Sequence, residues 1–144
     1  MDDRQRNLIR ESFEHVRPCQ QQAGELFYRE LFRLAPGLIP MFAEASLEVQ
    51  SHKLMQLLAY VVDHLDCWPI IGTEVAALGE RHTGYGVRSD HYAPVGAALI
   101  ATLKAAIGDE FSSDAEEAWT ELYTDLSLAM EKGAVNTGEN QMDP

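Results

Sequence analysis

Three polar side chains lie on the apolar faces of three separate helical stretches. His82 ends an apolar stripe, four residues after Leu78. Gln50 lies four residues before Leu54, and Tyr28 lies within a stretch rich in phenylalanine and leucine. A neutral imidazole can ligate a metal ion, whereas a phenol O–H and an amide N–H can donate hydrogen bonds to a polar ligand. The competing interpretation of His82 is a hydrogen-bonded packing residue, the commoner role of a histidine in a helical core.

The elements that position these side chains are predicted to be helices throughout, an all-α fold of six or seven helices. Apolar residues recur at helical spacing, and prolines and glycines divide the chain into blocks. Trp68-Pro69 and Gly72 are expected to end the third long helix, and Ser89 or Asp90 to cap a later one. The first expected helix runs from residue 3 to Pro18, and the next three cover residues 20–34, 47–65 and 73–82. The fifth ends at Gly108, and the last begins at a capping box formed by Ser113 and Glu116.

Length and charge limit the class of protein further. A chain of 144 residues supports one domain with a core. With 11 basic and 23 acidic side chains the net charge is −12, which disfavours nucleic acid and anionic membranes as partners. No apolar stretch is long enough to span a bilayer, and Cys19 and Cys67 form neither a metal-ligand pair nor a disulfide framework. We expect a cytoplasmic, acidic protein without a phosphate-binding loop, zinc motif or nucleophile elbow.

Several motifs occur in one order along most of the chain, from about Asn7 to Met130. The distance from Gln50 to His82 is 32 residues. The motifs are Phe27-Tyr28-Arg29-Glu30-Leu31-Phe32, Pro36 with Phe42, Gln50-Ser51-His52-Lys53-Leu54, Arg81-His82, Gly86-Val87, Tyr92-Ala93-Pro94-Val95-Gly96, and Trp119 with Tyr123. In this order and spacing the chain resembles the globin family, and most closely its bacterial branch of single-domain haemoglobins and flavohaemoglobin haem domains.

The resemblance implies a fold and a cofactor. The fold is the globin fold, with six to eight helices in a three-over-three arrangement around haem b (iron protoporphyrin IX). The haem-binding domain is expected to cover residues 1–133, and residues 134–144 to form a polar, disordered tail. His82 becomes the axial metal ligand, with the carbonyl of Leu78 as acceptor for its other ring nitrogen. The expected cofactor-binding residues are Phe42, Lys53, Leu54, Leu78, His82, Val87, Arg88, Tyr92, Val95 and Leu99.

On the distal side the resemblance assigns Tyr28 and Gln50 as hydrogen-bond donors to a bound gas. Gly24 and Ser51 are small and could let their two helices cross closely. His52 is a rival to Gln50, although it lies about 200° round the helix from the Leu54 face by the geometry of an α-helix. Lys53 and Arg88 are expected near the haem propionates, and plain solvated charge is the alternative for both.

On the proximal side Tyr92 matches a tyrosine that, with a late carboxylate, forms a hydrogen-bonded network in flavohaemoglobins. We group Tyr92 with Tyr28 and Gln50 as candidate catalytic residues. The carboxylate position holds Ala134, counted from Trp119. Glu131, one turn earlier, could take its place only with a shift of the helix end.

The expected function is reversible binding of dioxygen for storage or delivery, with carbon monoxide and nitric oxide as further ligands. A second activity is nitric oxide dioxygenation, which needs a separate NAD(P)H-dependent reductase because the chain has no flavin or nicotinamide domain. One alternative is a six-coordinate haem sensor or electron-transfer globin, with Tyr28 or His52 as sixth ligand. Another is a haem-free globin fold that binds proteins. The oligomeric state is expected to be a monomer or homodimer.

Overall fold

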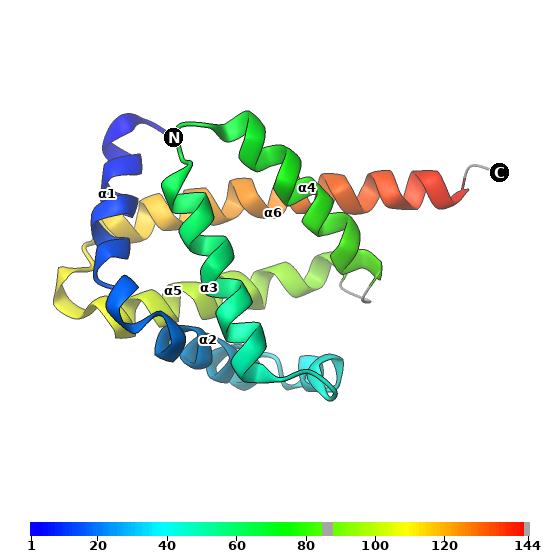
Figure 1. Ribbon diagram of the computed structural model, residues 1–144, viewed down its shortest axis with the longest axis horizontal. Helices are drawn as coiled ribbons and strands as arrows, with labels where there is room; N and C mark the ends of the chain where they lie inside the picture. The colour runs from blue at the N-terminus through cyan, green and yellow to red at the C-terminus, as the bar shows by residue number, and fades with distance from the viewer. Residues whose placement is uncertain (85–87, 143–144) are drawn as a thin grey trace.

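The computed structural model describes residues 1–84 and 88–142, with the backbone alone for residues 82–84, 89 and 134–142. All regular elements in these ranges are helical, as the sequence predicts (Figure 1). The α-helices are α1 (Asp3–Glu14), α2 (Gln20–Leu34), α3 (Leu47–Asp63), α4 (Trp68–Gly84), α5 (Tyr92–Ile107) and α6 (Ser113–Met142). Short 3-10 segments are η1 (Arg17–Cys19), η2 (Pro36–Phe42), η3 (Ser89–His91) and η4 (Gly108–Glu110).

The helices form two crossed layers. In Figure 1, α1, α3 and α4 cross over α2, α5 and α6, and the close helix pairs include α4 with α6, α2 with α3 and α2 with α5. Apolar stripes of both layers meet in one core, in which Ile9, Phe13 and Trp119 are fully buried. The indole Nε1–H of Trp119 donates to Ser12 Oγ over 2.8 Å and so ties α6 to α1. The structure therefore has the predicted three-over-three arrangement.

Local signals explain most helix boundaries. Asp2 and Gln5 form a reciprocal capping box at the start of α1, and Ser46 Oγ accepts from Val49 N at the start of α3. Gly108 ends α5 with a positive φ of 75°, a conformation that favours glycine. Helix α2 occupies the predicted range 20–34.

Three boundaries differ from the prediction. Trp68-Pro69 was expected to close a helix, but α4 begins at Trp68 because proline fits the first turn, where its missing N–H is not needed. Neither Ser89 nor Asp90 caps α5, which begins at Tyr92 without a side-chain cap. Ser112 in place of Ser113 caps α6, since its Oγ accepts from Ala115 N over 3.1 Å.

Helix α6 is the longest element and passes Gly133, where the sequence analysis places the end of the domain. Its backbone is helical to Met142. The expected division into a domain of residues 1–133 and a tail of residues 134–144 stays a prediction. In the part of the chain that the structure describes, no helix is long and apolar enough to cross a membrane.

Candidate functional site

Tyr28 lies in a cluster of aromatic rings between α2 and η2. Its ring centroid is 5.0 Å from that of Phe27, 5.4 Å from that of Phe42 and 6.1 Å from that of Phe32. Helical spacing explains the pair Tyr28 and Phe32, because residues four apart share one face of α2. Phe42, the last residue of η2, lies 5.4 Å from Phe32 and closes the cluster. The structure thus brings together two of the predicted site residues, Tyr28 and Phe42.

Tyr28 is a buried residue whose hydroxyl forms no hydrogen bond with a described residue. The side chain is 7% exposed, and burial raises its pKa to about 12. The phenol therefore keeps its proton at neutral pH and can donate from Oη. A donor without a protein partner at this position is compatible with a polar ligand held beside the aromatic cluster.

The second predicted donor, Gln50, lies in the first turn of α3 and is half-buried. Its side-chain amide makes no hydrogen bond to a described residue. Its neighbour Ser51 packs against Gly24 of α2, where an added Cβ would come within 2.8 Å of Ser51 Cβ. Gln21 Nε2 strengthens the same crossing by donating to the Glu48 carbonyl over 3.0 Å. The predicted close crossing of these helices is confirmed, and it places Tyr28 one turn beyond the contact and Gln50 next to it.

The other predicted site residues of α3 differ in burial, because they lie on different faces of the helix. Leu54 is half-buried and packs against the core, as a residue that lines an apolar site must. His52 is exposed, which agrees with its predicted position on the opposite side of the helix. Lys53 is exposed too and forms no ion pair with a described residue. Its charge therefore has no competing partner among the described residues.

Helix α4 carries the predicted iron ligand. The backbone at His82 is helical, while its side chain, like the whole of Val87, lies outside the described residues. One and two turns before it, Leu78 is half-buried and Val75 is 2% exposed. The helix thus presents an apolar face that leads up to the predicted ligand.

At the start of α5, Tyr92 is half-buried, and Val95 and Leu99 follow on its inner face, Leu99 with 6% exposure. Burial raises the pKa of Tyr92, and the negative charge of Glu131 on α6 raises it further. No hydrogen bond joins these two described side chains. The charge of Glu131 therefore influences Tyr92 without the direct bond that the predicted network would need, and its role in that network stays a prediction.

A contact missed by the sequence analysis fixes Tyr92 from α6. Tyr123 Oη donates to the Tyr92 carbonyl over 2.6 Å. Burial raises the pKa of Tyr123 well above its ordinary value, with smaller contributions from Tyr92 and Glu131. The two tyrosines are separated by 31 residues, so no local spacing signal could reveal the contact.

Arg88, predicted as a propionate partner, is exposed and already paired. Its guanidinium donates to both carboxylate oxygens of Asp90, over 3.3 and 3.2 Å. A propionate would have to compete with Asp90 for this charge. Lys53, the other predicted cation, has no competing carboxylate among the described residues, and its role as a propionate partner stays a prediction.

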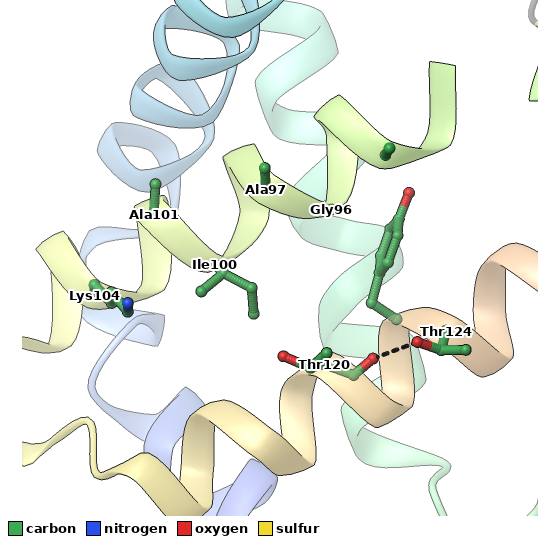
Figure 2. Close-up of a pocket in the computed structure, with 9 residues that line it drawn as sticks. Gly96, Ala97, Ile100, Ala101, Lys104, Thr120 and Thr124 are labelled. Carbon is green, nitrogen blue, oxygen red and sulfur yellow. Dashed lines mark hydrogen bonds between the residues drawn. The ribbon is translucent and has the colours of Figure 1, made fainter. Parts of the chain in front are cut away.

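The molecule also has an open groove of about 570 Å³ between α5 and α6. Figure 2 shows Gly96, Ala97 and Ile100 of α5 opposite Thr120 and Thr124 of α6. An added Cβ on Gly96 would come within 2.7 Å of the Tyr123 ring, so glycine allows this close packing. The groove contains none of the predicted donors and no titratable group except Lys104 and Tyr123. It is separate from the candidate site.

Comparison with known proteins defines the class. The family model described as Globin matches residues 25–130, most of the chain. The chain therefore belongs to the globin family, whose members bind haem and small gas ligands such as dioxygen. Curated relatives include neuroglobin of Chaenocephalus aceratus, 28% identical over 156 residues (99% of this chain and 98% of the relative), and neuroglobin-1 of Oncorhynchus mykiss, 27% identical over the same shares.

A solved structure supports the fold. It is the crystal structure of a hexacoordinated heme protein from an anhydrobiotic tardigrade at pH 4, with a TM-score of 0.82 and 16% sequence identity. The alignment covers 93% of this chain and 95% of that one. At this identity the similarity bears on the fold alone.

Proposed function

We propose that this globin binds haem b through His82 and binds dioxygen reversibly at the opposite face. Haem, when bound, supplies an iron that takes up diatomic gases. The chain supplies the environment: Leu54, Val95 and Leu99 form apolar surface, and Phe42 packs beside the group. The apolar enclosure excludes water and strengthens every hydrogen bond formed inside it.

The observation that supports this function best is Tyr28, a buried residue whose hydroxyl keeps its proton and forms no hydrogen bond with a described residue. Its raised pKa keeps the proton on Oη, so it acts as a donor. Gln50 Nε2 adds a second donor beside the α2–α3 contact. Donors of this kind favour dioxygen over carbon monoxide, since dioxygen is the stronger acceptor when both bind the same metal.

The second candidate is a six-coordinate haem sensor or electron-transfer globin. The solved structure described as a hexacoordinated heme protein has the same fold, so the fold is compatible with this function. Two features of this chain oppose it: His52 is exposed, and the Tyr28 phenol resists ionisation. A sixth ligand from Tyr28 would require loss of the proton that burial retains. We therefore place oxygen binding first.

The finer assignments are part of the same proposal. We assign the chain to the bacterial branch and a cytoplasmic location, as a monomer or homodimer without nucleic-acid or membrane partners. Nitric oxide dioxygenation is the proposed second activity, supported by the Tyr28 and Gln50 donor pair. It requires a separate NAD(P)H-dependent reductase, so the purified protein should consume nitric oxide stoichiometrically. Sustained consumption with NADH alone would contradict this.

Visible absorption spectra of the haem-loaded protein test the main proposal. Spectra are recorded for the ferric protein, after dithionite reduction, and after exposure to dioxygen and to carbon monoxide. We expect a five-coordinate ferrous spectrum that converts to a stable oxygen adduct. Sharp α and β bands in the ligand-free ferrous protein would favour the six-coordinate alternative. Failure to retain haem would leave a haem-free protein-binding role.

A further inference from the structure

Helices α4 and α6 touch backbone to backbone at two glycines. A Cβ added to Gly79 of α4 would lie 2.1 Å from the Met130 carbonyl oxygen and 2.6 Å from Met130 Cα. A Cβ added to Gly133 of α6 would lie 1.9 Å from the Ala76 carbonyl oxygen. The contact is reciprocal, because each helix contributes one glycine against the backbone of the other. Even alanine is too large at either position.

Glycine is required at these two positions because the helix backbones lie too close for a side chain, and not because of the backbone conformation. Gly108 is the one glycine of the described residues with a positive φ. The atoms opposite Gly79 and Gly133 belong to backbone, which has no rotamer to adopt. A side chain at either site must therefore push the helices apart, by about 1 Å if a Cβ at Gly79 is to reach 3.0 Å from Met130 O.

The contact lies at the end of α4 that carries His82. Gly79 precedes His82 by three residues, about 4.5 Å along a helix, so a shift of the helix at Gly79 reaches His82 almost undiminished. Gly72 lies near the other end of α4 and differs: a Cβ there would meet only Trp68 Nε1, at an ordinary 3.7 Å. The tight contact is therefore local to the segment that bears the predicted ligand.

We propose that Gly79 and Gly133 are positioning residues that set the distance and tilt of His82 relative to the haem iron. This inference rests on the proposed function, because it assumes that His82 ligates haem. By packing without side chains, the two glycines hold α4 close against α6. Any larger residue moves α4 off α6 and changes the geometry of the iron–histidine bond.

The test compares Gly79→Ala with Gly72→Ala in the full-length, haem-loaded protein. Both variants replace glycine by alanine in one helix and gain the same helix propensity, so they differ in the available space. The readouts are the iron–histidine stretching band in resonance Raman spectra of the reduced protein and the rate constant of carbon monoxide binding. We expect Gly79→Ala to shift the band and to change the rate constant about tenfold or more, since misplacement by 1 Å can cost ~100-fold. Gly72→Ala should match the wild type in both.

Gly133→Ala is the second variant, because its new methyl group lies on α6 and leaves the sequence of α4 intact. If Gly79→Ala does not fold, the same two quantities are measured on Gly133→Ala, and a shifted iron–histidine stretching band supports the proposal. If the Gly79 or Gly133 variant binds haem and has the same stretching band and the same rate constant as Gly72→Ala, this inference is overturned while the proposed function stands. A wild type that retains no haem would overturn the proposed function, and this inference with it.

Discussion

Gly24 of α2 and Ser51 of α3 are in contact where their helices cross, and a Cβ on Gly24 would come within 2.8 Å of Ser51 Cβ. Ser51 is fully buried, and its hydroxyl has no hydrogen-bond partner among the described residues. Tyr28 lies one turn after Gly24, and Gln50 directly precedes Ser51. The size of these two small residues therefore sets how closely the two distal donors approach.

Replacing Tyr28 by phenylalanine should speed the release of dioxygen. The variant keeps the ring contacts but loses the O–H donor, and a strong hydrogen bond is worth about 1.5–3 kcal/mol. The dissociation rate should rise by about 10- to 100-fold, with a smaller change for carbon monoxide, as measured by stopped-flow spectroscopy. Tyr60→Phe on α3, where Tyr60 stacks on His64, is the control. Equal rates in Tyr28→Phe and Tyr60→Phe would contradict the role of Tyr28.

Replacing His82 by alanine should abolish stable haem binding, because the site loses its axial ligand. The measurement is the Soret absorbance that stays with the protein after gel filtration. His52→Ala is the matched control and should keep both haem and the wild-type ferrous spectrum, since His52 is exposed. A change from six- to five-coordination in His52→Ala would instead identify His52 as the sixth ligand.

The raised pKa of Tyr28 gives a stability effect at alkaline pH. An unfolded tyrosine ionises near pH 10, whereas Tyr28 in the folded protein has a pKa of about 12. The unfolded chain therefore loses this proton first, and the free energy of unfolding falls as pH rises from about 10 to about 12, by up to about 2–3 kcal/mol. Urea unfolding of apoprotein at several pH values measures the slope. Tyr28→Phe should show a shallower decline, and an equal decline would refute the assignment.

Glu131→Gln should lower the pKa of Tyr92, because the negative charge of Glu131 adds to the effect of burial. Tyr123, which Glu131 also affects, should shift in the same direction. Ultraviolet difference titration of the phenols measures both. Glu117→Gln, at an exposed position on the same helix, should leave the titration unchanged. Identical curves for the two variants would exclude Glu131 as the carboxylate of this network.

Ser12→Ala should destabilise the fold by about 1–3 kcal/mol. Ser12 Oγ accepts from Trp119 Nε1 and donates to the Leu8 carbonyl over 2.7 Å, so alanine leaves a buried indole N–H unpaired. The midpoint of urea unfolding measures the loss. Ser127→Ala, which removes a hydroxyl bonded to Thr124, should change stability by less than about 0.5 kcal/mol. Similar losses of stability in both variants would mean that the bond from Trp119 to Ser12 contributes no more than an ordinary surface hydroxyl bond.

Local sequence signals predicted the helices better than they predicted contacts. The range of α2 and the stop at Gly108 were correct because apolar spacing and a glycine define them within one element. Pro69 misled the prediction because proline both ends helices and fits their first turn. The family spacing pointed to Tyr28, which is buried, and to Gln50, which is half-buried, and their role as donors stays a prediction.

Contacts between distant segments left no such signal. The bond from Tyr123 to Tyr92 joins residues 31 positions apart and depends on how two helices lie against each other. The sequence analysis could name Glu131 only as a substitute for the residue at position 134. Its effect on Tyr92 follows from how α6 lies against α5, which no periodicity encodes.

The bond between Ser12 and Trp119 has a consequence for synthesis, because it joins segments 107 residues apart. In a nascent chain that ends before Trp119, Ile9 and Phe13 of α1 are exposed to solvent, because α6, which carries Trp119, is not yet present to cover them. The domain can complete its core only after α6 has left the ribosome. Until then α1 is a candidate for chaperone binding.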